Sequence, residues 1–326
     1  EPVALGKRNA INNFCIGIQS NWPGCTSCHA GYGWEDEGYD FGDDGNVDCL
    51  VCHDNSGQYV KGSAGYPVEG VDLALAAQSV GGPSRTSCGG CHFKGGGGDA
   101  VKHGDLDTSL AFPTENIDVH MGAHGFLCTD CHQASDHVIK GRAASVSLDQ
   151  SNSAACTDCH RDDLHDDDRI NGHVDTVACQ TCHIPTAAVK EATKVHWDWS
   201  DAGQDLEEDH EYLKIKGSFI YEKAITPEYE WWTGTVERYL LGDPVDPDGP
   251  TALNSPVGSI DDPDAKIWPF KIHRAVQIYD PINGYLLQPK TVGEGGYWTD
   301  FDWDQAVRLG SEVVGLDYSG TFDWAD

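Results

Sequence analysis

The chain has 326 residues and a formal net charge of −32 at pH 7, with 53 acidic and 21 basic side chains. Such a charge argues against nucleic acid as a partner, because the two polyanions repel each other. No run approaches the roughly 18 consecutive apolar residues that a membrane-spanning helix needs, so no membrane span is expected.

Twelve of the 13 cysteines fall into six copies of the pentapeptide Cys-x-x-Cys-His, which is the attachment signature of c-type haem. The two thiols bond to one edge of the porphyrin, and the following histidine binds the iron. Random placement of these residues would give only about 0.02 such pentapeptides. The sequence therefore predicts six covalently bound haem c groups, on Cys25/Cys28/His29, Cys49/Cys52/His53, Cys88/Cys91/His92, Cys128/Cys131/His132, Cys156/Cys159/His160 and Cys179/Cys182/His183.

Other uses of paired cysteines fit this pattern less well. Zinc ribbons do not require a histidine after every pair, and a redox dithiol is a single motif near a strand–helix turn. A disulfide framework has no reason to repeat one pentapeptide. Because haem is attached on the outer side of the cytoplasmic membrane, we expect an exported protein, periplasmic or extracellular. The opening residues Glu1, Pro2 and Val3 have the character of a processed or trimmed start.

All six motifs lie between Cys25 and His183, which leaves too little chain around each haem for an ordinary apolar core. We predict a haem-binding domain over 1–186 that holds the six motifs. For the chain as a whole we predict mainly short helices and irregular loops wrapped around a haem stack, with little β structure. The glycines at 95–98 suit this fold, since glycine lets the backbone approach a flat ring closely.

Residues 187–326 contain no cysteine and are rich in Trp, Tyr, Asp and Pro. Neither a helical nor a strand period persists there, so we predict a haem-free, loop-rich segment that covers the haem stack. One helical stretch is predicted at about 302–314, where an apolar stripe is formed by Trp303, Ala306, Val307, Leu309 and Val313.

The axial ligands follow from counting. The chain has 15 histidines and a single methionine, Met121, so at most one haem takes a His/Met pair. Haems with two histidine ligands have lower potentials than His/Met haems, which predicts low-potential electron transfer. For His210, in an acidic run, a surface position is favoured, and for His196 both readings stay open. Outside the motifs lie His103, His120, His124, His137, His165, His173, His196, His210 and His273.

Several segments resemble the octahaem tetrathionate reductase family of multihaem cytochromes c, and the likeness includes residues outside the haem motifs. The family carries eight haems, whereas this chain has six motifs; the family's first and last motifs would precede Glu1 and follow Asp326. Either the chain is trimmed from a longer one, or it is a six-haem member. The matching stretches are 6–15, 25–34, 47–54, 95–107, 178–185 and 197–200.

The resemblance implies a catalytic haem on Cys25/Cys28/His29, with Lys102 as its distal ligand, Cys15 as an extra thiol and Asp99 as an acid. Independently, Cys15 is the one thiol left over, which marks it as reactive; the alternative is a small buried apolar side chain. For Lys102 the alternative is a solvated surface amine. The resemblance also implies six candidates for the five remaining distal positions, His103, His120, His137, His165, His173 and His273.

Two functions remain open. One is a reductase of a sulfur or nitrogen compound (tetrathionate, nitrite or hydroxylamine), in which five haems feed electrons to the Lys-ligated one. The other is a pure electron carrier, including the subunit of an extracellular filament or another homo-oligomer. The expected partners are redox proteins and a small inorganic substrate. An anionic substrate requires a local basic pocket against the overall negative charge, with Lys102, Lys190 and Lys194 as candidates.

Overall fold

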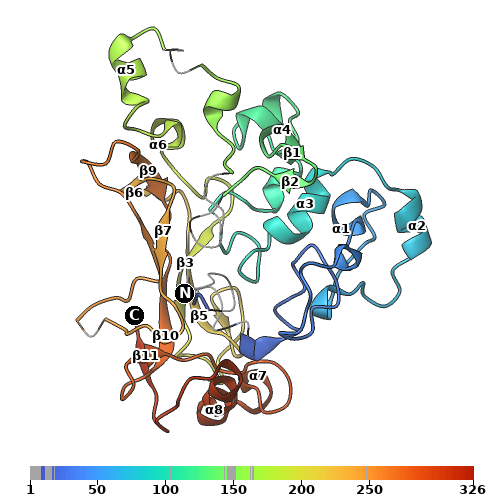
Figure 1. The fold of residues 1–326 in the computed structure, drawn as a ribbon, viewed down its shortest axis with the longest axis vertical. Helices are drawn as coiled ribbons and strands as arrows, with labels where there is room; N and C mark the ends of the chain where they lie inside the picture. Colours follow the sequence, from blue (N-terminus) through green and yellow to red (C-terminus); the bar gives the residue numbers. More distant parts are fainter. Residues whose placement is uncertain are drawn as a thin grey trace.

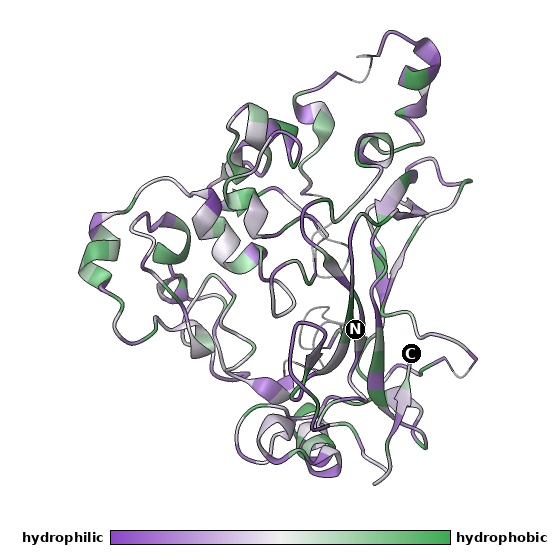
Figure 2. Cartoon of the chain, turned by 180° about the vertical axis from the view of Figure 1, so that it is seen from behind, coloured by the Kyte–Doolittle hydropathy of each residue, from purple (hydrophilic) through white to green (hydrophobic). Residues whose placement is uncertain are grey.

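A computed structural model describes residues 9–11, 17, 19–102, 104–142, 144, 152–161, 163, 165–246 and 248–326. The motif helices α1 (Leu50–His53), α3 (Arg85–His92) and α4 (Cys128–Cys131) occupy one side of the molecule, and β-strands from the second half of the chain form a spine on the other side (Figure 1). Helix α6 (Cys179–His183) lies above β9 (Lys266–Phe270) at one end of the spine. Within the described residues, no helix is long and apolar enough to cross a membrane. Figure 2 shows apolar residues spread over the short helices and the central strands alike.

The helices of the first half are short because most of them are single haem motifs. A spacing of three residues puts both cysteines of a motif on one helical face, so that both thiols reach the same porphyrin edge. Four of these helices and one 3-10 turn, Cys156–Asp158, contain motif cysteines. The helices are α1 (Leu50–His53), α2 (Leu73–Gln78), α3 (Arg85–His92), α4 (Cys128–Cys131), α5 (Asp168–His173) and α6 (Cys179–His183).

The second half forms a six-stranded sheet in the order β11-β10-β3-β5-β4, with β12 paired to β10. Strands β3 and β10 run parallel, and the other pairs of this sheet are antiparallel. Two further pairs, β6–β9 and β7–β8, extend the spine. The strands are β3 (Thr193–Asp198), β4 (Tyr212–Leu213), β5 (Gly217–Glu222), β6 (Glu228–Trp232), β7 (Val236–Arg238), β8 (Asn254–Pro256), β9 (Lys266–Phe270), β10 (Arg274–Asp280), β11 (Tyr285–Leu286) and β12 (Asp323–Ala325).

The prediction of little β structure was therefore wrong, because the chain contains a six-stranded sheet. The strands are short, and a register shift between Lys194 and His196 interrupts the alternation of β3. The alternation of apolar and polar residues that marks a strand cannot continue over such short, interrupted segments. The sequence pattern therefore does not predict them. The aromatic residues were the better signal, because Trp, Tyr and Phe favour strands.

The predicted helix near 302–314 is confirmed as α8 (Trp303–Val314). The side chain of Asp302 accepts the Gln305 N–H at 3.1 Å and begins the helix, and Gly315 ends it in the left-handed region. Its buried face differs from the predicted stripe: Ala306 and Val307 are buried, whereas Val313 is 57% exposed.

An aromatic cluster joins the sheet to α7 (Tyr297–Asp300) and α8. Trp197 and Trp199 stack with ring centres 4.5 Å apart, and Phe219 meets Trp197 edge-on. Tyr297 stacks on Trp303 at 3.6 Å. The cluster gives the second half an apolar core of its own.

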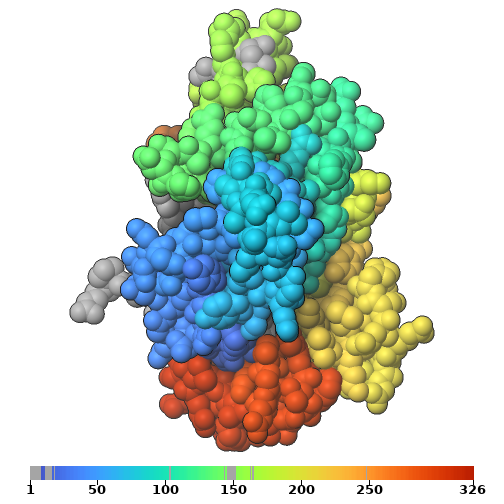
Figure 3. Space-filling view, turned by 90° about the vertical axis from the view of Figure 1, so that its right-hand side faces the viewer, coloured from blue at the N-terminus to red at the C-terminus, as the bar shows by residue number. Residues whose placement is uncertain are grey.

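The two halves meet where the turn at Gln19–Asn21 packs on the segment before α7. In Figure 3 the blue and cyan surface of the first half lies directly against the red surface of the C-terminal helices. Asn21, 1% exposed, donates to Pro289 O at 3.2 Å and accepts from Thr291 N at 2.6 Å and Thr291 Oγ1 at 2.7 Å. The side-chain amide of Asn21 thus makes hydrogen bonds to buried polar groups of Pro289 and Thr291 in the second half of the chain.

Replacing Asn21 by alanine is expected to destabilise the protein by about 2–3 kcal/mol, because the buried groups around the lost amide would have no partner. Thermal unfolding of the haem-loaded protein, followed by circular dichroism, checks this. Asn55, which is exposed and makes one long bond to Gly82 O at 3.3 Å, provides the control Asn55→Ala. Equal midpoints for the two variants would show that the contact between the halves does not depend on Asn21.

Candidate haem-binding and catalytic site

Thiols from different motifs lie against one another. Cys91 hydrogen-bonds to Cys28, Cys88 to Cys128, and Cys156 to Cys179, and these contacts together with burial raise the pKa of Cys88 and Cys91. The Cys88 contact lowers the pKa of Cys128.

Longer-range interactions complete the series of thiol contacts. The thiol of Cys131 lies near enough to that of Cys159 for a charge interaction. The thiol of Cys52 interacts in the same way with those of Cys88 and Cys91. The first, third, fourth, fifth and sixth motifs therefore follow one another in a row, and the second motif lies beside the third.

Cys182 is one of six exposed motif cysteines; the others are Cys28, Cys49, Cys131, Cys156 and Cys159. It sits in α6 three residues after Cys179, on the same helical face, but Cys182 is exposed whereas Cys179 is half-buried. The sixth motif joins the row of thiols through Cys179. A thioether is made at the edge of a porphyrin, so an exposed thiol is compatible with attachment. Haem attachment at each of the twelve motif cysteines stays a prediction.

The motif histidines are oriented by backbone carbonyls. Nδ1 of His53 lies 2.8 Å from Gly81 O, Nδ1 of His132 lies 2.8 Å from Lys140 O, and Nδ1 of His29 also contacts a carbonyl, that of Thr26. A carbonyl only accepts, so Nδ1 must carry the proton, and Nε2 of His53 and His132 then presents a lone pair suited to iron. The side chains therefore fit a haem ligand set.

Three motif histidines face a second histidine. The ring centres are 6.3 Å apart for His53 and His137, 6.0 Å for His160 and His120, and 6.0 Å for His183 and His165. Two imidazoles that bind one metal ion from opposite sides, each through a nitrogen at about 2 Å, have ring centres roughly 6 Å apart. The three pairs therefore have the spacing of axial ligands on one iron.

Local structure places each of these second histidines. His137 lies at the tip of a hairpin between β1 (Ala134–Ser135) and β2 (Val138–Ile139). Both tip residues have positive φ, 50° at Asp136 and 65° at His137, which is the backbone of a type I′ turn. Positive φ in residues other than glycine is often retained at functional sites.

The other two are fixed by hydrogen bonds. His120 lies in a π-turn at Val119–Ala123, and the Arg85 side chain donates to Met121 O at 2.9 Å and Phe126 O at 3.0 Å around it. Nδ1 of His165 lies 3.2 Å from Asn171 Oδ1, and the Asn171 amide donates back to His165 O at 2.8 Å.

The remaining histidines are distributed differently. His173 is exposed at the end of α5, whereas His273 is half-buried, with both ring nitrogens shielded from solvent, in the wall of a cavity that His196 also lines. His210 lies at the surface, as predicted, with its side chain 75% exposed beside Glu211. His103 and Cys15 lie outside the described residues.

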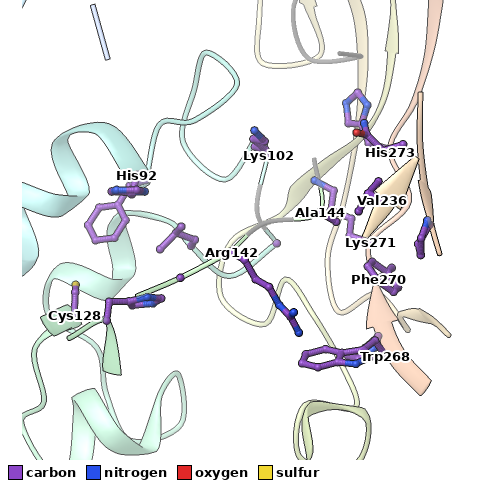
Figure 4. A pocket seen from close by; sticks show the side chains of 18 of the residues that line it. His92, Lys102, Cys128, Arg142, Ala144, Val236, Trp268, Phe270, Lys271 and His273 are labelled. Atoms are coloured by element: carbon purple, nitrogen blue, oxygen red, sulfur yellow. The ribbon is translucent and has the colours of Figure 1, made fainter. Parts of the chain in front are cut away.

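The cavity has a volume of about 2520 Å³, well above the roughly 300–1,000 Å³ of pockets that hold one small ligand. Figure 4 shows His92 and Cys128 on one side of it and Trp268, Lys271 and His273 on the other. The space is large enough for more than one planar cofactor between the motif helices and the β spine.

Lys102 lies in the wall of this cavity, between His92 and His273 in Figure 4. Asp99 is exposed, and its carboxylate accepts the Thr108 N–H at 2.9 Å and the Thr108 hydroxyl at 2.5 Å. The cavity therefore contains the predicted lysine, while the carboxylate of the predicted acid is bound by a neighbouring turn.

The first motif is held by a buried network that the sequence did not predict. Lys61 donates to His29 O at 2.8 Å and to Gly31 O, and its amine lies 3.5 Å from the Asp48 carboxylate. The Tyr59 hydroxyl donates to the same carboxylate at 2.6 Å. The side chains of Lys61 and Asp48 are 6% and 4% exposed, so the first and second motifs are tied by one buried ion pair.

Family models and known proteins match this architecture. A model described as "Cytochrome c bacterial" matches residues 194–326, and one described as "Cytochrome c7 and related cytochrome c" matches 113–184. These matches define the class of protein, a multihaem c-type cytochrome.

A solved structure of octahaem cytochrome c from Shewanella oneidensis has 48% sequence identity and a TM-score of 0.90, over 98% of this chain and 76% of that one. An uncharacterised protein of Archaeoglobus fulgidus is 29% identical over 143 residues, which is 37% of this chain. The chain spans about half of that relative, 48% of its length. The chain belongs to the octahaem tetrathionate reductase family of multihaem cytochromes c.

Proposed function

We propose that the protein is exported, carries six covalent haem c groups, one on each motif, and moves electrons between partner proteins or to a substrate. The observation that carries this proposal is the three imidazole pairs at 6.0–6.3 Å, the spacing of axial ligands on one iron. The haems supply one-electron transfer. The row of motif thiols supports an electron path that follows the same order.

A reductase site is proposed at the haem of Cys25/Cys28/His29, with Lys102 as its exchangeable distal ligand. An amine binds iron only when it is deprotonated, so burial must hold it neutral, and such a ligand can leave to admit a substrate. Asp99 and Cys15, the latter outside the described residues, are proposed to line its pocket. Asp99 must first release Thr108 before it can deliver a proton to a product.

The proposed distal ligands of the other five haems come from His103, His120, His137, His165, His173 and His273. Three of these, His120, His137 and His165, face a motif histidine. For the substrate we propose tetrathionate, nitrite or hydroxylamine. Reduction of tetrathionate takes two electrons, breaks the central S–S bond and yields two thiosulfate ions, with the electrons supplied by a redox partner protein.

A pure electron carrier, either monomeric or assembled end to end in a filament, is the second candidate. The observation in its favour is the row of neighbouring motifs from Cys28 to Cys179. Iron with two imidazole ligands has no open position, so haems of this kind relay electrons without binding substrate.

The visible and electron paramagnetic resonance spectra of the oxidised protein separate the two candidates. A high-spin signal that changes on addition of tetrathionate, nitrite or hydroxylamine is expected for the reductase. A spectrum that is entirely low-spin and does not respond to these compounds would reject the reductase and favour the carrier.

A further inference from the structure

A cluster of positive charge lies inside this strongly acidic chain, next to the cavity. We call Lys194, Lys216 and Lys271 the lysine enclave. Burial, followed by the charges of Lys216 and Lys271, lowers the pKa of Lys194 to about 7. Among the described residues, no Asp or Glu forms an ion pair with any of the three. The enclave is therefore a region of positive potential without an acidic counterpart in this part of the chain.

Two of the three amines are held rigidly. Nζ of Lys194 lies 3.4 Å from the ring centre of Phe219 and 4.0 Å from that of Trp197, where cation–π attraction stabilises it. Nζ of Lys271 donates to Val101 O at 2.9 Å and to the Thr193 hydroxyl. Burial lowers the pKa of Lys271 to about 7, and in its protonated form the amine has three donors and retains one for a ligand.

The third amine, that of Lys216, extends from the turn between β4 and β5 toward the glycine-rich loop. The Trp197 indole donates to Lys216 O at 2.7 Å and fixes this turn. Nζ of Lys216 lies 3.7 Å from the position that a Cβ on Gly97 would take, and Gly97 has a φ of +95°. Lys102 follows Gly97 on the same loop, so the enclave adjoins the loop that carries the proposed distal ligand.

Two indole donors in the same aromatic cluster have no acceptor. The Trp199 N–H and the Trp298 N–H are buried without a hydrogen-bond partner among the described residues, and Trp199 is only 2% exposed. A buried donor without an acceptor costs free energy. Unpartnered donors and grouped amines therefore belong to one aromatic cluster, and both favour an anionic ligand.

We infer that the lysine enclave binds one anionic oxygen group. Two sources supply this chemistry: a free sulfur or nitrogen oxyanion, and the propionate carboxylate of an attached haem. Either would offset part of the positive charge of the three amines and accept hydrogen bonds from Lys216 and Lys271. With a free oxyanion, the inference rests on the proposed reductase and gives it an anion-binding subsite beside Lys102. With a propionate, it holds for an electron carrier as well.

The test uses the oxidised, haem-loaded protein and sodium sulfate as a redox-inert oxyanion, titrated by calorimetry at constant ionic strength. For a free-oxyanion site we expect one saturable binding site, with the Kd raised about tenfold or more in Lys216→Gln and largely kept in Lys216→Arg. Lys214, in the same turn but paired with Asp205 at 2.5 Å, provides the matched control Lys214→Gln, which should bind as the unsubstituted protein does.

For a propionate site we expect no sulfate binding. Instead, Lys216→Gln should shift the midpoint potential of one haem in a redox titration, and Lys214→Gln should not. The inference would be overturned if sulfate bound with the same Kd in Lys216→Gln as in the unsubstituted protein. It would also be overturned if sulfate did not bind and Lys216→Gln did not shift any haem midpoint potential. These experiments measure binding and potential, not turnover. A negative result for Lys102 in the turnover assay would therefore leave the enclave site intact, and a negative result here would leave the Lys102 proposal intact.

Discussion

Replacing Lys102 with histidine is expected to lower reductase activity roughly 100-fold or more, the effect of losing a group that acts in the reaction. An imidazole binds iron firmly at neutral pH and would close the proposed position, whereas a buried neutral amine is near the balance between bound and protonated forms. The ligands of the other haems are unchanged by this substitution. The measurement is turnover of tetrathionate, nitrite and hydroxylamine with a chemical electron donor.

Lys94→His is the matched control, because Lys94 is exposed at the start of the same glycine-rich loop. It should retain activity and the full set of spectral signals. Full activity in Lys102→His would mean that this haem is not the catalytic one, and the electron-carrier proposal would then be preferred.

Replacing His137 with glycine should convert one low-spin haem to high spin. The His137 ring faces His53 at 6.3 Å, so its removal opens one side of the proposed iron position. Glycine adopts the φ of +65° at this hairpin position without strain, which confines the change to the lost ligand. Electron paramagnetic resonance of the oxidised protein, integrated against the total haem, measures the conversion.

Asp136→Gly is the control, since it relieves the same kind of backbone strain at φ 50° and keeps the imidazole. It should leave every haem low-spin that is low-spin in the unsubstituted protein. If the spectrum of His137→Gly matches that of this control, His137 is not an axial ligand and another residue faces His53.

The haem motifs and α8 could be predicted from the sequence because each is a local pattern. Cys-x-x-Cys-His is complete within five residues, and the capped, periodic run from Asp302 to Gly315 needs only its own neighbours. The sheet could not be predicted in this way. Strand β3 gains its place by pairing in parallel with β10, far along the chain, and its alternation is broken before His196.

The sequence predicted which residues belong to the site but not how they are arranged in space. The sequence and its family resemblance singled out His120, His137 and His165, but which motif histidine each one faces depends on how distant segments pack. For the same reason the sequence could not distinguish the exposed Cys182 from its half-buried motif partner Cys179.

The buried Lys61 and the half-buried Lys216 and Lys271 were missed because their surroundings come from distant parts of the chain. Lys61 and the enclave residues Lys216 and Lys271 show no local pattern that marks them as buried or grouped. The scarcity of basic residues, 21 in 326, was the one available signal, because it makes any buried lysine conspicuous.

The most direct test of the account is the intact mass of the protein under denaturing conditions. Covalent haem survives denaturation, whereas haem held by axial ligands alone is released. The account predicts a mass above the 35.3 kDa polypeptide by six haems, one for each Cys-x-x-Cys-His motif. An increment of four haems or fewer would contradict it.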